Sequence, residues 1–395
     1  MKTGKPELLG EMNKTLILDY LRKNGPKSRA DIKRVLGLSF PTVSTNVRDL
    51  IDSNMIIETG ISDNSIGRKA TLLEFNSNIG YVLGVDVGRA YIRMMICDLS
   101  GGILFSTISE KGTQQTVQGI LEQIDIEFVR VLKGAGIRQE ELLIISIGIP
   151  GIVDEKEGRH RLAPFMVPFE NIRLDQYMRD KYGIPTICGN SVDFGAIGEK
   201  WKGAGREYQN IVYISYAVGI GCAIILKGEL YTGSNGAAGE VGYMLPGLLF
   251  QRTAFDEEGV MEKLIAGLEL ERRIVLQNDL PYSDVKDFLS REEEQSFPGA
   301  ELVNEIKKYI GLLMVNLVSV INPEVIILGG GIGKHFAVKY HDYFQDFLAA
   351  HVPYVPLLVP PSLDEKANLL GAVAYALRNL HSDYSSLGMN KLTKT

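Results

Sequence analysis

The first 75 residues alternate short apolar-periodic segments with chain breakers. Residues 14–23 carry apolar side chains at helical spacing and stop at an Asn-Gly-Pro sequence. Ser28 can cap a second helix over 29–37, and Ser39 can cap a third over 40–54, because a serine oxygen accepts from the free amides of a first turn. Two short helices, a turn with a glycine and a longer helix predict a helix-turn-helix.

The predicted third helix has two different faces. Its apolar face, which would pack on the first two helices, consists of Val43, Val47, Leu50 and Ile51. Its other face has small hydroxyl side chains, which can enter a major groove closely, and one arginine: Thr42, Ser44, Thr45 and Arg48. Arg29, at the start of the second helix, is placed for a contact with a backbone phosphate.

Two short apolar strands, 55–60 and 70–75, enclose a polar tip that contains Arg68 and Lys69 beside a glycine. An arginine at such a tip can insert into a narrow minor groove. The pattern predicts a winged helix-turn-helix DNA-binding domain over residues 1–75. A three-helix module for protein interaction, which has the same helix pattern, is the alternative.

The rest of the chain, residues 80–395, repeats one plan of strands. Residues 80–104 predict a strand, a tight glycine turn, a second strand and a hairpin, and residues 210–231 repeat that order. A duplicated unit indicates two similar halves that face each other. Buried apolar strands alternate with helical stretches at about 114–134, 173–182, 192–202, 255–277, 299–320, 334–350 and 366–379. This alternation predicts an α/β fold.

Glycine-rich turns follow three of the predicted strands. They contain Asp86 and Gly88, then Gly219 and Gly221, then Gly329 and Gly330. Glycines in such turns let backbone amides approach a phosphate without a Cβ clash. Each turn also fits a purely structural role, so their order is more informative than any single turn.

Charge and composition refine this organisation. The 395 residues carry a formal net charge of −6, but residues 1–75 have 12 Lys and Arg against 9 Asp and Glu, and the remainder has 30 against 39. A basic head on an acidic body suits a DNA reader attached to another domain. The chain has no apolar run near the roughly 20 residues of a membrane span and no secretory signal. Its three cysteines are far apart, so we expect a reduced, cytoplasmic protein.

These motifs together resemble the ROK family (repressors, open reading frames, kinases) and, within it, the xylose-repressor type of regulator. Besides the winged head, the matching motifs are GVDVG (84–88), GIPG (148–151), GNSVDFGAIGE (189–199), AVGIG (217–221), GSNGAAGEVGYM (233–244) and VIILGGGIG (325–333). The resemblance implies an actin-like, ribonuclease-H-type body of two lobes. It also implies a sugar in the cleft between them and, in the family's enzymes, ATP across from it.

The sequence departs from the family's kinases at the residues that carry the chemistry. The catalytic Asp of the family's Glu-Asn-Asp triplet is Ser191 here, and a serine does not accept a proton at neutral pH without help. The first and second glycine turns also differ from the family's phosphate turns, and phosphoryl transfer depends on positioned donors. We therefore regard Asp86, Gly88, Gly219 and Gly221, with Gly329 and Gly330, as vestigial phosphate turns, and we expect no catalytic residue.

The resemblance also implies where a ligand would bind. Asn190, Glu240 and Glu262 match family residues that contact sugar hydroxyls, and buried hydroxyls need such partners. Tyr243 replaces the family's zinc-binding His, and no Cys or His occurs over 244–275, so we expect no metal. Tyr243 and Phe165 can stack on a sugar face, or they can belong to a pocket that has closed.

The sequence therefore predicts a DNA-binding transcriptional regulator, a repressor of carbohydrate genes such as those of xylose metabolism. Its expected partners are duplex operator DNA, a sugar or sugar derivative and a second copy of the chain, with no cofactor and no membrane. An ATP-dependent sugar kinase with an appended DNA-binding head is the alternative. A third interpretation is a DNA-binding scaffold that responds to no ligand.

Overall fold

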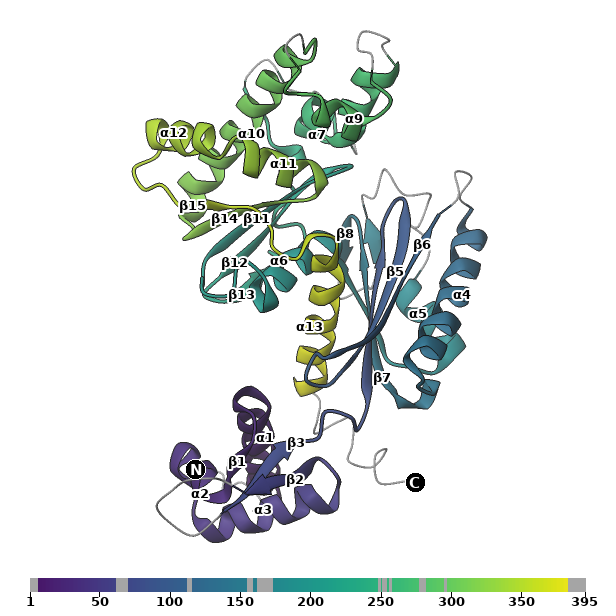
Figure 1. Cartoon of the computed structure of the whole chain (residues 1–395), viewed down its shortest axis with the longest axis vertical. Helices are drawn as coiled ribbons and strands as arrows, with labels where there is room; N and C mark the ends of the chain where they lie inside the picture. Colours follow the sequence, from purple (N-terminus) through teal and green to yellow (C-terminus); the bar gives the residue numbers. More distant parts are fainter. Residues whose placement is uncertain are drawn as a thin grey trace.

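The computed structural model describes residues 6–61, 70–111, 116–154, 159–161, 173–247, 250, 254–255, 258–276, 282–294 and 297–382. Residues 6–75, which we call the head, lie at one end of the long axis, and two lobes follow along it (Figure 1). The predicted wing-tip residues Arg68 and Lys69 and the predicted pocket residue Phe165 lie outside the described residues.

The head contains the predicted helices and strands. Its elements are α1 (Pro6–Asn24), β1 (Lys27–Ser28), α2 (Arg29–Leu36), α3 (Phe40–Asp52), β2 (Ile56–Ile61) and β3 (Thr71–Phe75), with the sheet in the order β1-β3-β2. Both predicted caps are confirmed, because Ser28 accepts from the amide of Asp31 and Ser39 from that of Thr42. Helix α1 is longer than predicted, and the pattern did not predict the two-residue strand β1.

The core of the head forms where the apolar face of α3 meets α1 and α2. Val43, Val47 and Leu50 are fully buried, as the pattern predicted, and Ile51 is half-buried. Asn46 is also buried, although its polarity gave no sign of it. Its side-chain amide donates to the carbonyl of Thr42, which satisfies the buried donor.

The first lobe, residues 80–190, contains a five-stranded sheet in the order β10-β7-β4-β5-β6. The strands are β4 (Tyr81–Val87), β5 (Tyr91–Asp98), β6 (Ile103–Glu110), β7 (Leu142–Ile149) and β10 (Thr186–Asn190). Helices α4 (Val117–Ala135) and α5 (Leu174–Tyr182) cover one face of this sheet (Figure 1). A short hairpin, β8 (Ile152–Asp154) and β9 (Arg159–Arg161), follows β7, and one 3-10 turn lies at Gln139–Glu141.

The second lobe, residues 203–366, repeats this sheet in the order β13-β12-β11-β14-β15. Its strands are β11 (Ile211–Tyr216), β12 (Ile220–Leu226), β13 (Glu229–Tyr231), β14 (Val325–Gly329) and β15 (Leu357–Val359). Its helices are α7 (Val260–Ile265), α8 (Gly267–Glu271), α9 (Val285–Ser290), α10 (Ala300–Ile321), α11 (Gly331–Lys339) and α12 (His341–His351). In each lobe three antiparallel strands are followed by two parallel ones, so the predicted duplication is confirmed.

Two long helices predicted for the second lobe are each divided. The stretch 255–277 forms α7, α8 and a π-helical segment, Arg272–Leu276, because Ala266 leaves helical geometry and Gly267 packs on the carbonyl of Ala217. The stretch 334–350 divides at Tyr340 into α11 and α12. The structure also adds α9, β8, β9 and β15, which are too short to give a clear periodic pattern.

Helices α6 (Ser191–Lys202) and α13 (Ala367–Ser382) lie between the two sheets and pack on each other (Figure 1). Their approach is close because glycines stand at the crossing. A Cβ on Gly198 would lie 2.1 Å from the carbonyl oxygen of Ala367, and one on Gly371 would lie 1.7 Å from that of Phe194. The two helices therefore form one tightly packed unit between the lobes.

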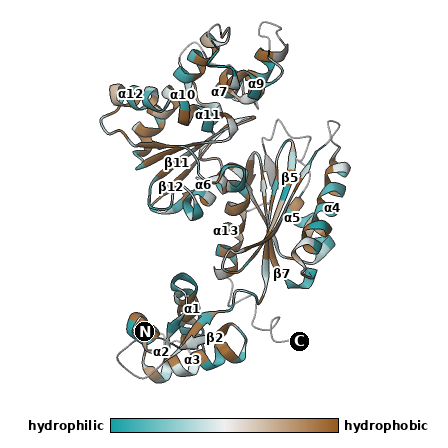
Figure 2. Cartoon of the chain, viewed as in Figure 1, coloured by the Kyte–Doolittle hydropathy of each residue, from teal (hydrophilic) through white to brown (hydrophobic). Residues whose placement is uncertain are grey.

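Residues of high hydropathy are concentrated in the two sheets and along α13 (Figure 2). The core of the head is continuous with that of the first lobe: Leu50, Phe75, Leu99, Leu377 and Leu380 belong to one buried cluster. No helix of the described residues has the length and apolar character needed to cross a membrane.

Candidate functional site

A cavity of about 230 Å³ lies at the junction of the two lobes. Its walls come from six places in the chain: the β4–β5 turn, the end of β7, the start of α6, the β11–β12 turn, the segment 240–243 with α7, and the start of α13. The predicted ligand residues that line it are Asn190, Glu240, Tyr243 and Glu262, and the predicted turn residues are Gly219 and Gly221. The fold therefore brings the four predicted ligand residues, which are up to 72 positions apart, into one space with residues as distant in sequence as Arg89 and Asn368.

Asn190 and Ser191 stand where β10 ends and α6 begins. Asn190 is the N-cap of α6, and its Oδ1 accepts from the amide of Val192 at 2.7 Å. The side-chain oxygen of Asn190 thus caps the helix, and its NH₂ group remains as the group that can donate to a ligand. Ser191 is the first residue of α6 and also lines the cavity, so its hydroxyl is a second polar group at this point of the wall.

Glu240 and Glu262 place two carboxylates on the same wall. Burial raises the pKa of Glu240 to about 7. Burial also raises the pKa of Glu262 to about 7, and the neighbouring charge of Glu240 adds to this shift. Hydrogen-bond donors of a polyol would relieve both effects by pairing with the ionised oxygens. The wall is therefore better suited to hydroxyl groups than to an anion.

Tyr243 provides an aromatic wall beside these carboxylates. Its ring stacks on that of Phe255, with centroids 5.9 Å apart and an interplanar angle of 18°. Phe255 is mostly exposed and is not among the described residues that line the cavity, so it supports the ring of Tyr243 from outside. Stacking of Tyr243 on a sugar stays a prediction.

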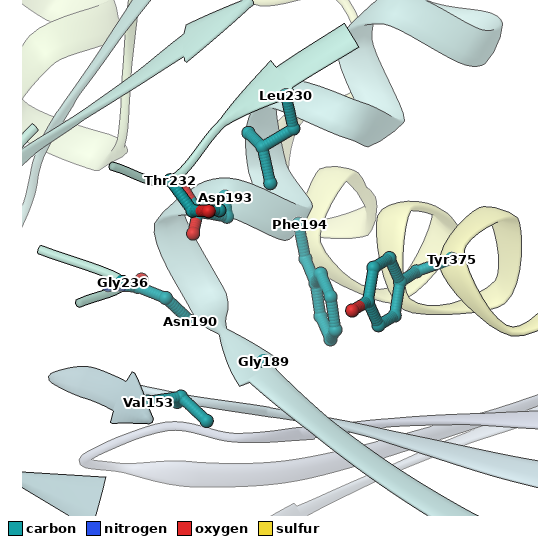
Figure 3. A pocket seen from close by; sticks show the side chains of 9 residues that line it. All are labelled: Val153, Gly189, Asn190, Asp193, Phe194, Leu230, Thr232, Gly236 and Tyr375. Atoms are coloured by element: carbon teal, nitrogen blue, oxygen red, sulfur yellow. The ribbon is translucent and has the colours of Figure 1, made fainter. Parts of the chain in front are cut away.

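A second, much smaller cavity of about 20 Å³ also contains Asn190 in its wall. Figure 3 shows Phe194 and Tyr375 side by side at one wall, with their ring centroids 5.2 Å apart, and Asn190 near Gly236 at another. A space of this size can hold a water molecule but no sugar ring. The larger cavity is therefore the candidate ligand site.

Two residues of the first glycine turn, Asp86 and Gly88, are not among the described residues that line the cavity, although Arg89 of the same turn is. Asp86, at the end of β4, is buried; its carboxylate is 3.3 Å from the guanidinium of Arg93, and it accepts a 3.5 Å hydrogen bond from Asn368. Burial raises the pKa of Asp86 in spite of Arg93. Lys111 is also buried near this carboxylate, without a hydrogen-bond partner for its Nζ, and burial lowers its pKa to about 8. The protein's own cations thus surround Asp86.

Sequence reasoning did not identify Arg93 or Lys111. Arg93 stands inside the apolar strand YIRMMICD, directly across from Asp86 in the β4–β5 register. A charged residue inside a buried strand needs a partner, so this position contained a usable signal. Arg89, in the turn that follows β4, does line the cavity.

The third glycine turn is packed against protein atoms. A Cβ on Gly329 would lie 2.7 Å from the ring of Tyr213, and one on Gly330, whose φ is +78°, would lie 2.4 Å from the carbonyl oxygen of Tyr216. Both glycines are required by this packing. Like Gly88 and Asp86, they are not among the described residues that line the cavity.

The candidate DNA surface lies on α3, at the end of the head farthest from the lobes (Figure 1). Thr45 and Arg48 are exposed there, and Ser44 is half-buried. The hydroxyl of Thr42 lies 2.7 Å from that of Ser39, so Thr42 also supports the helix cap. Arg29 forms a 3.5 Å ion pair with Glu58 of β2, which any phosphate contact would have to replace.

No cluster of three or more His, Cys, Asp or Glu side chains suited to a metal occurs among the described residues. Cys97, Cys188 and Cys222 are free thiols. Burial raises the pKa of the Cys97 thiol to about 12, and it raises those of Cys188 and Cys222 as well. These thiols are therefore protonated at neutral pH and poorly reactive.

Comparison with known proteins gives two family matches and several similar chains. A model described as ROK family matches residues 82–379, and one described as winged helix-turn-helix DNA-binding matches residues 13–57. The xylose repressor of Bacillus subtilis is 28% identical over 91% of this chain and 94% of its own.

Among solved structures, a ROK family transcriptional regulator, described as a homologue of the Escherichia coli MLC protein, has a TM-score of 0.78. It is 21% identical and covers 98% of this chain and 100% of its own. The ROK hexokinase of Thermus thermophilus has a TM-score of 0.63 at 24% identity, over 76% of this chain and 99% of its own. Both structures have the same fold as the parts they match.

Proposed function

The chain belongs to the ROK family, and from that premise we propose that it is a transcriptional repressor whose affinity for operator DNA is set by a sugar or a sugar derivative. The winged head over residues 1–75 would bind the operator, and the two lobes from residue 80 onward would sense the ligand. The similarity to a xylose repressor over nearly the whole length of both chains supports this division of roles and makes D-xylose the first ligand to test.

The head supports DNA binding through the position of α3. Its outer face presents Thr45 and Arg48 away from the core, where a helix in a major groove has its base-reading residues. We propose that Ser44, Thr45 and Arg48 contact bases or phosphates and that Arg29 contacts phosphate. We assign Arg68 and Lys69, on the basis of sequence alone, to the minor groove.

The cavity supports a sugar as the effector. Glu240, Glu262 and Asn190 would pair with hydroxyl groups, and Tyr243 would stack on a ring face. Binding of such a ligand between the lobes would favour one arrangement of the lobes over another, which is what allostery requires.

One observation carries the proposal of a regulator without kinase activity: Ser191 stands at the cavity where a kinase needs a base. The pairing of Asp86 with Arg93 supports the same conclusion, since a metal–nucleotide complex would have to compete with an internal cation.

The test has two parts. Operator fragments are first selected from a random duplex library with the ligand-free full chain. Their affinity is then measured by fluorescence anisotropy with and without D-xylose, L-arabinose, D-glucose and N-acetyl-D-glucosamine. We expect nanomolar operator binding that weakens at least fivefold with one of these sugars. A chain that selects no DNA sequence contradicts the proposal.

The alternative of a sugar kinase with an appended head is favoured by the match to a ROK hexokinase over the lobes. An assay for ATP consumption with the same sugars separates the two functions. Turnover at several per second, which is common for kinases, would overturn the regulator proposal. A DNA-binding scaffold without a ligand predicts sequence-specific binding together with no shift of the melting midpoint by any sugar.

We also propose that two copies of the chain act together on DNA. Helix-turn-helix proteins read two half-sites about one helical turn apart, and this spacing requires two heads in a fixed relation. Sedimentation of the full chain with and without selected operator tests this proposal. A complex of one chain per operator contradicts it.

A further inference from the structure

The hairpin Asp98–Gly102, between β5 and β6, lies between the end of α6 and the head. Helix α6 begins at the cavity with Asn190 and Ser191 and runs for 12 residues to Lys202. At 1.5 Å of rise per residue its far end is about 18 Å from the ligand site. Residues that contact this end of α6 can therefore be displaced by ligand binding without contacting the ligand.

The far end of α6 packs closely on the hairpin and is hydrogen-bonded to it. Lys202 Nζ donates to the carbonyl of Gly101 at 2.6 Å. The ring of Trp201 lies against the same residue, because a Cβ on Gly101 would be 2.3 Å from the Cη2 atom of the indole. Gly101 also has a φ of +81°, which favours glycine. The contact therefore depends on one glycine, one indole ring and one ammonium group.

The hairpin itself is well braced. The Oδ1 atom of Asp98 accepts from the amides of Ser100 and Gly102, each at 2.8 Å, and from the hydroxyl of Ser100 at 2.7 Å. Leu99 is fully buried in the apolar cluster that the head and the first lobe share. A braced turn of this kind moves as a unit when one side of it is displaced.

The other side of the hairpin is hydrogen-bonded to Ser77 of the segment 76–77, which connects the first lobe to the head. The amide of Leu99 donates to the carbonyl of Ser77 at 3.0 Å. The next residue toward the head, Asn76, donates its own amide to the carbonyl of Met55 at 3.0 Å and its side chain to the carbonyl of Asn54 at 2.9 Å. The amide of Met55 in turn donates to the carbonyl of Leu50 in α3. The connecting segment is thus linked, through Met55, to the last turn of α3.

We propose that α6, the hairpin Asp98–Gly102 and residues 76–77 form a relay that transmits the ligand state of the cavity to the position of α3. The proposal rests on the proposed function and adds the route of its regulation. A ligand that draws Asn190 and the start of α6 toward Glu240 displaces Trp201 and Lys202. Because Trp201 and Lys202 contact the hairpin, their displacement moves the hairpin and the segment that connects it to the head.

Trp201 is the only tryptophan in the chain, so its fluorescence reports on this joint alone. We expect D-xylose, or the sugar of the panel that raises the melting midpoint most, to change the intensity or the emission maximum of the full chain. Trp201 is about 15 Å along the helix axis from the start of α6 at the cavity, so we expect no direct contact between the ligand and the ring. Saturable sugar binding without any change in tryptophan emission overturns the relay.

The decisive variants are Lys202→Met and Trp201→Leu, each compared with Lys200→Met. Lys200 lies on the same helix, but its Nζ bonds to the carbonyls of Arg206 and Tyr208 in the second lobe. We expect the two relay variants to bind the sugar and ligand-free operator within about twofold of wild type. The sugar should weaken their operator binding less than twofold, whereas Lys200→Met should keep the wild-type response. An equal response in all the variants overturns the relay.

Hydrogen exchange of the ligand-free full chain gives a readout that needs no effector. Lys202→Met should speed amide exchange over residues 50–55 and 76–80 several-fold and leave residues 211–226 unchanged. Unchanged exchange over 50–55 overturns the relay. A wild-type chain whose operator affinity responds to no sugar is instead a failure of the proposed function, and the exchange result still decides whether the joint is coupled to the head.

Discussion

Arg93 and Asp86 face each other across β4 and β5, with the guanidinium 3.3 Å from a carboxylate that is almost fully buried. Arg93 also reaches Glu365 at 3.2 Å, so one side chain joins the first lobe to the segment that leads into α13. The pair lies beside the first glycine turn. The buried carboxylate of Asp86 therefore has a cation of the protein itself next to it.

Arg93→Met should destabilise the protein strongly. Arg93→Met takes the nearest cation away from a buried carboxylate, and removing one partner of a buried ion pair costs about 3 kcal/mol or more. We expect a fall in the melting midpoint of about 6 °C or more, given about 2–4 °C for each kcal/mol in domains of this size. The double variant Asp86→Asn with Arg93→Met should recover most of the loss. A double variant as unstable as Arg93→Met would contradict the charge explanation.

The two cavity carboxylates should make the ligand-free protein less stable as pH rises. Their folded-state pKa values are raised to about 7 from 4.5, so the folded protein retains protons that the unfolded chain has released. The stabilisation is full below about pH 4.5 and is lost as pH rises through 7. Glu240→Gln should therefore raise the melting midpoint by a few degrees at pH 8 and not at pH 4.5, as measured by calorimetry.

Glu258→Gln is the matched control for this pH effect. Glu258 is two residues from α7 and pairs with Lys263 at 3.6 Å, but it is not among the described residues that line the cavity. Because the charge of Glu258 is only a minor cause of the raised pKa of Glu262, its variant should gain clearly less stability at pH 8 than Glu240→Gln. Glu240→Gln should also abolish any thermal shift by sugar, since a carboxamide pairs less well with hydroxyl donors. A sugar shift that persists in Glu240→Gln would remove this carboxylate from the ligand site.

Much of this architecture follows from sequence pattern because it depends on local signals. Residues close together in sequence determine the caps at Ser28 and Ser39 and the duplicated order of strands. The structure confirms these features. The pairing of Arg93 with Asp86 requires the register of two strands, and the contact of Trp201 with Gly101 joins positions 100 residues apart. Spacing along one chain does not encode either contact.

The candidate site could be predicted only in part from the sequence, because part of it also depends on contacts between distant residues. Motif matching selected Asn190, Glu240, Tyr243 and Glu262, and all four line one cavity. Motif matching could not distinguish a glycine turn that lines the cavity from one that packs against protein atoms, because both kinds of turn require glycine. Gly219 and Gly221 face the cavity, whereas Gly329 and Gly330 serve close packing against tyrosines of β11.

Arg48→Ala should weaken binding to the selected operator by about 1–3 kcal/mol, which is the range for an arginine that reads a guanine edge. Sugar binding should not change, because the cavity lies in the lobes. Arg130→Ala, on the exposed side of α4, removes the same charge far from α3 and should leave operator affinity unaltered. Anisotropy titrations at two salt concentrations separate a base contact from a phosphate contact. A loss that is equal for every DNA sequence indicates phosphate only.

Ser191→Asp should not convert the protein into a kinase. The substitution restores a carboxylate near the candidate sugar site, but Asp86 remains paired with Arg93, and phosphoryl transfer needs both a base and a positioned metal–nucleotide complex. We expect no ATP turnover above background in a coupled assay with any sugar of the panel. Measurable turnover in Ser191→Asp would show that the nucleotide site is intact and that one residue separates regulator from enzyme.

The crossing of α6 and α13 should tolerate no side chain. Gly198→Ala would place a methyl group 2.1 Å from the carbonyl oxygen of Ala367, and because that neighbour is backbone, the helices must separate. Overpacking of this kind costs about 1–3 kcal/mol. Gly10→Ala in α1 is the control: its Cβ would have no neighbour within 4 Å, and alanine in a helix gains about 0.5–1 kcal/mol over glycine. Opposite shifts of the melting midpoint are expected, and a neutral Gly198→Ala would mean that α6 and α13 are not held as one unit.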